Sequence, residues 1–353
     1  MSGRAKRVVV TGGAGFIGSH VVDALVARAH DVTVIDNFSP AAHAGRPDYL
    51  NPLAKYIDGD VLDQVLLERE LNGVDAIAHH AAIVGLGAGT LDGPLFARTN
   101  DVGTAELLRA ALRCRVPRLV LASSMVVYGE GSYRCGSDGS QRPMPRREID
   151  LAAGRFDPIC PRCGGPLEAI AITEDARLDP RSVYAATKVH QEHLAFIAMR
   201  EGGPAVTALR YHNVYGPRTP RDTLYAGVAS IFRSQIAAGQ APRVFEDGAQ
   251  RRDFVHVRDV AAANVRAIER EQPAIGAFNV GSGTPRTILE LATVLAATLG
   301  GRLPTVTGEY RVGDVRHVFA SSERADRELG LGPRVLFADG IRELAAAPLR
   351  GAA

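Results

Sequence analysis

The chain has few lysines, few cysteines and no long hydrophobic segment. Of its 41 basic residues, 38 are arginine and only three are lysine, in a total of 353 residues. Four cysteines in a chain of this length do not form a disulfide framework. No apolar run approaches the roughly 18 residues that a membrane-spanning helix requires. The segment Met1–Lys6 runs directly into a predicted strand and lacks the apolar core of a secretory signal, so we expect a cytoplasmic protein.

The overall charge gives no indication of a charged macromolecular partner. The formal net charge is +2, with 39 acidic residues against the basic ones, so neither a nucleic acid nor a membrane is expected as a partner. A hydrophobic content of 46% and a charged content of 23% are ordinary for a soluble globular enzyme. The length allows one large domain or two closely joined ones.

Strand and helix patterns alternate through the first two hundred residues. Such alternation predicts an α/β fold in which helices cover both faces of a doubly wound parallel sheet. The predicted strands are Arg7–Thr11, Asp31–Asp36, Val74–Ala78, Arg118–Ser123 and Ala205–Tyr211. The predicted helices are Gly15–Arg28, Leu62–Leu71, Asn100–Cys114 and Tyr184–Arg200.

After about Tyr211 the pattern changes to short strands and helices, interrupted by glycine and proline. We predict a first domain over residues 1–210 and a smaller α/β lobe over 211–353, with some segments of the lobe returning to the first sheet. The helix Ala226–Ala238 belongs to this lobe. Residues 131–169 form a polar insert that holds three of the four cysteines, and an unstructured loop of that length is uncommon inside a compact domain.

A glycine-rich turn follows the first predicted strand and opens the first predicted helix. Gly12, Gly15 and Gly18 have the spacing and the strand–helix context of a dinucleotide-binding turn, with Phe16 and Ile17 between them. The helix N-terminus then faces the pyrophosphate. A plain glycine-rich turn is the alternative. The turn therefore predicts that the domain 1–210 binds a dinucleotide, which we take to be NAD for the reason that follows.

A carboxylate at the end of the second strand indicates which dinucleotide binds. Asp36 lies 18 residues after Gly18, where it can bind both ribose hydroxyls and repel a 2′-phosphate, which favours NAD over NADP. The alternative is a turn-capping Asp followed by Asn37. Further predicted cofactor contacts are Asn37, Asp60, Val61, Ala81, Ala82, Asn100, Ser123, Tyr211 and Val214. A simple turn is the alternative at Asp60, and His79 and His80 are interpreted as spacers.

Tyr184 and Lys188 stand one helical turn apart, about 60 residues after Ser124. With nine tyrosines and three lysines in the chain, only about 0.08 such pairs are expected by chance. A phenol beside an ammonium and an oxidised nicotinamide can lose its proton near neutral pH. The pair therefore indicates a general base, against the alternative of a tyrosine on a helix surface.

Jointly these motifs resemble the extended short-chain dehydrogenases that act on nucleotide sugars. They occur in the order TGGAGFIG, Asp36, His80-Ala81-Ala82, SSMVVYG, YAATK and Arg210-Tyr-His-Asn-Val-Tyr-Gly-Pro217. The resemblance implies bound NAD, with Tyr184 as base, Lys188 beside it and Ser124 completing the site. It also implies substrate contacts from Ser124, Met125 and Asn213, and from Arg252 and Arg311, which match the arginines that bind the substrate diphosphate in that family. His212 stands where related enzymes usually have Phe.

The residues after Ser124 distinguish between reactions of this family. Related 4,6-dehydratases resemble Thr-Asp-Glu at this point, because eliminating water requires an acid and a base, whereas this chain has Met125 and Val126. Epimerisation at C4 of a dTDP- or UDP-hexose is therefore predicted, with an L-rhamnose-like sugar favoured by similarity to dTDP-L-rhamnose 4-epimerases. A 4-ketoreductase or dehydrogenase, a 4,6-dehydratase and a non-enzymatic NAD-binding scaffold are the alternatives.

Two further expectations concern a metal and a partner. Cys160-Pro-Arg-Cys163 resembles half of a zinc knuckle, and Cys135 with Asp138 provides a possible second half, so we predict one structural zinc. The alternative is free thiols on a flexible loop. In the resembling family the helices near Asn100–Cys114 and Tyr184–Arg200 form a four-helix contact, which predicts a homodimer.

Overall fold

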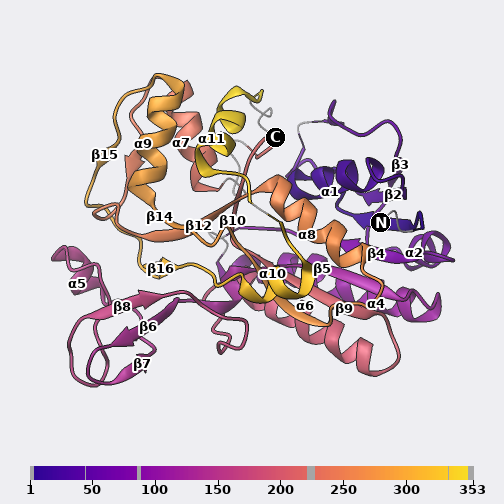
Figure 1. Ribbon diagram of the computed structural model, residues 1–353, viewed down its shortest axis with the longest axis horizontal. Helices are drawn as coiled ribbons and strands as arrows, with labels where there is room; N and C mark the ends of the chain where they lie inside the picture. The colour runs from indigo at the N-terminus through magenta and orange to yellow at the C-terminus, as the bar shows by residue number, and fades with distance from the viewer. Residues whose placement is uncertain (1–3, 44, 86–88, 221–226, 333, 349–353) are drawn as a thin grey trace.

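The structure is a computed structural model that describes residues 4–43, 45–85, 89–220, 227–332 and 334–348 (Figure 1). Its central element is a seven-stranded parallel sheet in the order β13-β9-β5-β4-β1-β2-β3. The strands are β1 (Arg7–Thr11), β2 (Asp31–Asp36), β3 (Lys55–Asp58), β4 (Ala76–His79), β5 (Arg118–Ser124), β9 (Ala205–Tyr211) and β13 (Gly276–Val280).

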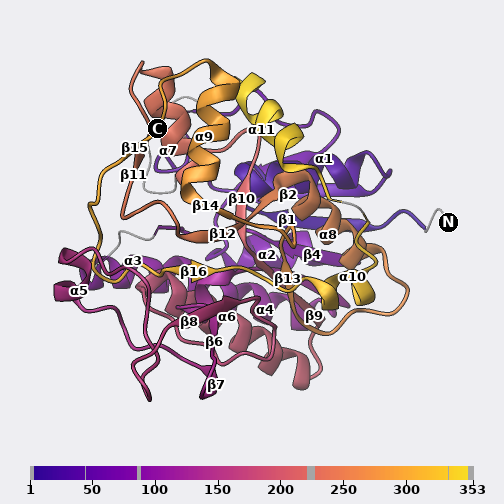
Figure 2. The same cartoon turned by 60° about the vertical axis from the view of Figure 1, so that its left-hand side comes forward.

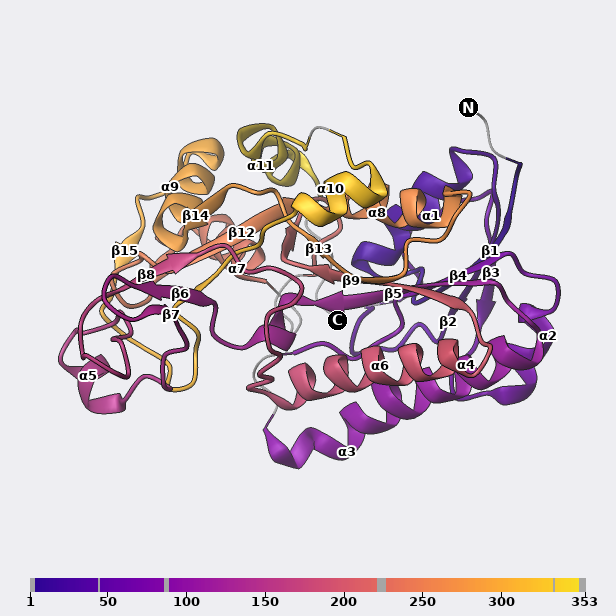
Figure 3. The same cartoon turned by 60° about the horizontal axis from the view of Figure 1, so that its bottom comes forward.

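Helices cover both faces of this sheet, as Figure 3 shows. On one face lie α1 (Phe16–Val26), α8 (Val257–Glu269) and α10 (Glu323–Leu329), and on the other lie α2 (Gln64–Leu71), α4 (Gly103–Arg113) and α6 (Val183–Arg200). The strands are buried on both sides because their residues are apolar in succession; Val8, Val9 and Val10 are at most 1% exposed. The predicted doubly wound α/β fold is confirmed.

The predicted element bounds agree closely, and the main difference lies before α4. The predicted helix Asn100–Cys114 is the end of a longer helical run formed by η1 (Thr90–Asp92), α3 (Gly93–Phe96), the π-helical η2 (Ala97–Val102) and α4. A π-helical segment is frequent at functional sites because it re-aims side chains. Here it carries the buried Asn100.

The second lobe packs beside the carboxyl ends of the central strands. Its strands are β10 (Asn213–Tyr215), β11 (Arg243–Val244), β12 (Arg251–His256), β14 (Pro285–Thr287), β15 (Thr305–Val306) and β16 (His317–Val318). Its helices are α7 (Val228–Ala237), α9 (Ile288–Leu299) and α11 (Phe337–Ala346), which enclose a separate apolar core. Residue 226 of the predicted helix Ala226–Ala238 and residues 1–3 lie outside the described residues. Two elements that follow Tyr211 in the chain belong with the central sheet, because β13 pairs with β9 and α8 packs on one face of the sheet.

The insert over residues 131–169 is an ordered unit with its own antiparallel sheet (Figure 2). The elements of the insert are β6 (Ser132–Cys135), β7 (Gly139–Gln141), α5 (Glu148–Ala152) and β8 (Leu167–Ile170). The short helix η3 (Met125–Tyr128) lies directly before it. These strands are too short and too polar to show an alternating pattern, so the sequence did not indicate them. Among the described residues, no helix has both the length and the apolar character needed to span a membrane.

Candidate active site

The glycine-rich turn between β1 and α1 passes directly against the end of β4. Gly12 has φ +67°, and a Cβ atom built there would lie 2.6 Å from the amide nitrogen of Ala81. A Cβ atom on Gly18 would lie 2.2 Å from the Gly12 carbonyl oxygen. Only glycine allows these approaches. Helix α1 begins at Phe16, and its N-cap residue is Gly15, so the backbone N–H groups of the first turn, including that of Ile17, are positioned to face an anion.

Asp36 at the end of β2 closes the other side of this turn. Its Oδ2 accepts a hydrogen bond from the Ala14 amide at 2.9 Å, and its Oδ1 accepts one from the Phe38 amide at 2.9 Å. The second contact is the turn-capping role that the sequence left open. Each carboxylate oxygen can accept a further hydrogen bond. The capping contact therefore leaves acceptor capacity on Asp36 for ribose hydroxyls.

The ends of β2 and β3 are joined by polar side chains. Asn37 donates to Oδ2 of Asp60 at 3.0 Å, and Oδ1 of Asp60 accepts from the Leu62 amide at 2.9 Å. The neighbouring Val61 is 4% exposed, and its side chain packs so closely on Gly103 that a Cβ atom there would lie 2.7 Å from it. These contacts fix the turn at which Asp60 and Val61 are predicted to contact the cofactor.

Two histidines, His79 and His80, fix the end of β4 through their side-chain contacts. His79 lies between the hydroxyls of Thr11 and Thr104, at 2.7 and 2.9 Å, and burial lowers its pKa to about 3, so the ring is neutral. His80 stacks on Tyr211, with ring centroids 6.2 Å apart and planes 10° apart. These contacts fit the spacer role predicted for both histidines. They leave Ala81 and Ala82, both partly buried, on the turn itself.

Asn100 is bound to the backbone that follows β4. Its Oδ1 accepts from the Ile83 amide at 2.8 Å, and its Nδ2 donates to the Ile83 carbonyl at 2.9 Å and to the Thr187 hydroxyl at 3.0 Å. The side chain is fully buried, and both amide hydrogens are engaged. Asn100 therefore fixes the backbone after β4, and its direct contact with a cofactor stays a prediction.

Helix α6 brings Tyr184 and Lys188 to the end of β5, where Ser124 lies. The Ser182 hydroxyl caps the helix by accepting from the Ala185 amide at 3.1 Å. Tyr184 and Lys188 are 7% and 4% exposed, and Nζ of Lys188 lies 5.9 Å from the Tyr184 ring centroid. This ammonium donates to the Ala122 carbonyl at 2.9 Å.

Burial is the largest influence on the pKa values of Tyr184 and Lys188. It raises the pKa of Tyr184, and a hydrogen bond with Ser124 only partly offsets the rise. Burial likewise lowers the pKa of Lys188 to about 8. The sequence predicted that Lys188 and an oxidised nicotinamide together would lower the pKa of Tyr184, and burial opposes that effect in the protein. The positive charge of an oxidised nicotinamide is then required to favour the phenolate.

A buried ion pair between Glu192 and Arg210 lies next to Lys188, and it was not predicted from the sequence. Glu192 accepts from Arg210 through both oxygens, at 2.9 and 2.7 Å, and both side chains are almost fully buried. Ser123 donates to the same carboxylate at 2.5 Å, so its hydroxyl is engaged with Glu192, and its contact with the cofactor stays a prediction. Glu192 follows Tyr184 and Lys188 at successive intervals of four on α6. That spacing on one helix face was the available signal.

The predicted substrate residues lie at the junction of the two lobes. Met125 is partly buried within η3, and Asn213 borders a small cavity with Thr219 and Phe254. The side-chain oxygen of Asn213 is buried and has no hydrogen-bond partner among the described residues. Val214 is partly buried against the main core and lies on β10, which pairs with β12. The Tyr211 hydroxyl is engaged with the side chain of Asn264.

The two predicted diphosphate arginines are held differently. Arg252 is partly buried and donates to the backbone carbonyls of Val315 and Arg316, at 2.7 and 2.8 Å. Arg311 is exposed, with its guanidinium carbon 5.0 Å from the centroid of the Phe245 ring. Arg311 therefore has donors to offer a diphosphate, and Arg252 keeps its Nε and one Nη2 hydrogen for the same role while its other donors bind backbone carbonyls, among the residues that the structure describes.

A family model described as the NAD dependent epimerase/dehydratase family matches residues 8–149 and 162–281. This match covers most of the central sheet, the Ser124, Tyr184 and Lys188 group and much of the second lobe. The chain belongs to this family. The family resemblance drawn from the motifs is thereby confirmed. The unmatched residues 150–161 lie within the insert.

Individual relatives match over nearly the whole chain. A dTDP-L-rhamnose 4-epimerase from Burkholderia thailandensis is 34% identical over 347 residues, which covers 96% of this chain and 94% of the relative. A UDP-N-acetylglucosamine 4-epimerase from Methanobrevibacter ruminantium, solved with UDP-N-acetylmuramic acid, is 30% identical with a TM-score of 0.77 and covers 97% of each chain. A UDP-glucose 4-epimerase from Thermus thermophilus, solved with NAD, is 29% identical with a TM-score of 0.74 and covers 96% of this chain and 97% of that one.

Proposed function

We propose that this protein is an NAD-dependent nucleotide-sugar 4-epimerase. The observation that carries the proposal is that Ser124, Tyr184 and Lys188 lie together, while the two residues after Ser124 in the chain are Met125 and Val126. The first three can move a proton at a carbinol, and the last two cannot transfer one. The relatives named above support the same reaction class.

The residues divide the chemistry between them. Tyr184 takes the proton of the sugar C4 hydroxyl and returns it, while Ser124 hydrogen-bonds the same oxygen and Lys188 supplies positive charge nearby. Bound NAD would supply the hydride acceptor and donor for C4, and the residues named here would hold the sugar and move its hydroxyl proton. Elimination of water needs a further acid and base at positions 125 and 126, which Met125 and Val126 cannot provide. The balance of groups therefore favours epimerisation over dehydration.

The glycine-rich turn and Asp36 would hold the cofactor. The two close approaches at Gly12 and Gly18 leave a backbone surface that fits a pyrophosphate, and the acceptor capacity of Asp36 suits ribose hydroxyls and opposes a 2′-phosphate. We propose NAD and not NADP on this basis. A dTDP- or UDP-hexose is the proposed substrate, and the 34% identical relative favours a dTDP-L-rhamnose-like sugar.

Incubation with a panel of dTDP- and UDP-hexoses, without added cofactor, tests the proposal. We expect C4 epimers to form, and we expect denatured protein to release NAD or NADH. A strict need for added reduced cofactor would indicate a 4-ketoreductase instead. Release of mainly NADP would mean that Asp36 does not bind the ribose.

The cysteines of the insert meet with Asp138 in a geometry that suits zinc. Their ligand atoms all lie within 4.8 Å of one another. Sγ of Cys135 is 3.5 Å from Sγ of Cys163, and Oδ2 of Asp138 is 3.2 Å from Sγ of Cys160 and 3.6 Å from Sγ of Cys135. A tetrahedral zinc with sulfur at about 2.3 Å places its ligands about 3.8 Å apart. We therefore propose one structural zinc held by these four residues.

Elemental analysis of protein purified without added metal should give close to one zinc per chain. Cys160→Ser removes one thiolate and should lower the zinc content well below that of the wild type. Cys114→Ser is the matched control, because Cys114 lies at the end of α4 and contacts the Glu68 carbonyl instead. Equal zinc content in the two variants would contradict the assignment, as would three freely titratable thiols in the wild type.

A homodimer through α4 and α6 is the proposed assembly. These helices lie side by side on one face of the sheet (Figure 3). Leu112 on α4 and Ile197 on α6 are 39% and 48% exposed, and Val102, at the end of η2 directly before α4, is 47% exposed. Light scattering at micromolar concentration should give twice the chain mass. Ile197→Glu should shift this mass toward that of one chain, whereas a monomeric wild type would contradict the proposal.

A further inference from the structure

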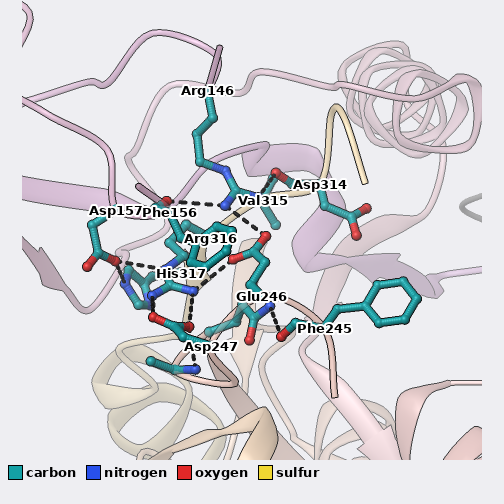
Figure 4. Close-up of polar contacts among 12 residues, drawn as sticks. Arg146, Phe156, Asp157, Phe245, Glu246, Asp247, Asp314, Val315, Arg316 and His317 are labelled. Carbon is teal, nitrogen blue, oxygen red and sulfur yellow. Dashed lines mark hydrogen bonds and ion pairs between the residues drawn. The ribbon is translucent and has the colours of Figure 1, made fainter. Parts of the chain in front are cut away.

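The insert is joined to the second lobe by a cluster of charged side chains. Figure 4 shows this Arg316 cluster, which we define as Arg146, Asp157, Glu246, Asp247 and Arg316. The first two come from the insert, the next two from the turn between β11 and β12, and the last from the segment before β16. Three stretches far apart in the sequence therefore meet here.

Arg316 is at the centre of the cluster and is 1% exposed. Its Nε donates to Asp157 at 2.7 Å, and its Nη1 donates to Glu246 at 2.8 Å. Both terminal nitrogens also bind Asp247, at 2.7 and 2.8 Å. Paired carboxylate contacts of this kind fix a guanidinium in orientation as well as in position. The backbone that carries Arg316 is fixed with it.

Arg146 holds Glu246 from the opposite side. Its Nη1 lies 2.8 Å from Oε1 of Glu246, and its Nη2 donates to the Asp314 carbonyl at 2.7 Å. Glu246 is buried and has φ +54°, a backbone conformation that a non-glycine residue adopts only when its surroundings hold it. One insert side chain thus binds both the strained turn and the segment that leads to Arg316.

The two segments held in this way are those that carry the diphosphate arginines. Arg252 is bound by the carbonyls of Val315 and Arg316, and Arg311 packs on Phe245, which directly precedes Glu246. On the basis of the proposed function, we propose that the insert positions Arg252 and Arg311 for the substrate diphosphate. Arg316 and Arg146 are its positioning residues, and neither needs to touch the substrate.

The proposed zinc site would tie together the ends of the insert segment that carries Arg146 and Asp157. The chain from Asp138 to Cys160 begins and ends at that site, and Arg146 and Asp157 both lie between these ends. Tying the ends of a loop together reduces the number of conformations open to it. The insert can therefore present Arg146 and Asp157 in one arrangement, although few apolar residues order it.

Arg146→Met tests the proposal, with Arg155→Met as the matched control. Arg155 lies in the same insert, and within the described part of the chain it pairs only with Asp150, at 3.1 and 2.6 Å. For Arg146→Met we expect KM for the nucleotide sugar, and Kd for UDP and dTDP measured by calorimetry, to rise about tenfold, the ratio that one charge-assisted hydrogen bond supplies. The kcat and NAD content should remain those of the wild type. A role confined to stability would instead lower kcat with the fraction of folded protein.

Other outcomes decide against the proposal or separate it from the proposed function. Unchanged Kd for UDP and dTDP in Arg146→Met overturns the positioning role while leaving the epimerase assignment intact. Wild-type protein that binds neither diphosphate contradicts the proposed function itself. If Arg146→Met does not fold, Asp157→Asn replaces it, because Asp157 is 69% exposed and its loss leaves the buried pairs in place. A rise of about threefold in Kd is then expected, and no rise overturns the proposal.

Discussion

Tyr184→Phe should lower kcat by about 100-fold or more, the scale of general acid–base catalysis. The phenol is the group placed to take the C4 hydroxyl proton, because it is buried beside Ser124 and Lys188 at the end of β5. Phenylalanine keeps the ring and its edge contact with Phe96, whose centroid lies 6.4 Å away. The variant should therefore fold and retain NAD, and steady-state kinetics with NAD content measured in parallel will check both parts.

Tyr56→Phe is the control for this loss of one hydroxyl. Tyr56 lies on β3, and its hydroxyl accepts a hydrogen bond from the Asn51 amide at 3.0 Å, remote from the proposed chemistry. Its kcat should match the wild type. Near-normal turnover in Tyr184→Phe would mean that another group moves the proton.

Arg210→Met should cost about 3–5 kcal/mol of unfolding free energy, because it leaves a buried carboxylate without its counter-charge. Arg210 binds Glu192 at 2.9 and 2.7 Å and also donates to the Tyr128 hydroxyl at 2.8 Å. Urea unfolding followed by circular dichroism gives the difference. The double variant Arg210→Met with Glu192→Met should recover part of the loss, since it removes the unpaired charge.

Arg113→Ala provides the matched comparison for this ion pair. Arg113 pairs with Glu68 at 2.5 Å, but the two side chains are 60% and 37% exposed. Such a surface pair contributes about 0–1 kcal/mol. Similar losses in Arg210→Met and Arg113→Ala would show that burial of the Glu192 carboxylate does not have the predicted cost.

The sequence predicted the parts of this molecule whose signals are local. β2 and β9 have the predicted bounds, because each is an apolar run limited by turn residues. The glycine turn and the pair Tyr184 and Lys188 were found because the spacing of a few residues determines their geometry. The fold class followed from the alternation of these local patterns.

The features that could not be predicted from the sequence are side-chain contacts between segments that lie far apart in the chain. The Arg316 cluster joins residues separated by up to about 170 positions, and nothing in the residues flanking Arg146 or Glu246 indicates a partner. The contacts of Asn100 with Ile83 and of Ser123 with Glu192 could not be predicted either, because the register of a helix against a strand end is set by packing. Those pairings become visible only when the segments are placed together.

The central claim is that a hydride leaves C4 of a nucleotide sugar and returns to the same carbon within one site. A dTDP- or UDP-hexose that the protein converts, labelled with deuterium at C4 and incubated in ordinary water, tests it most directly. We predict that the C4 epimer retains the deuterium at C4, as mass spectrometry and NMR will show. An epimer whose C4 deuterium has been replaced by hydrogen from water would contradict the account.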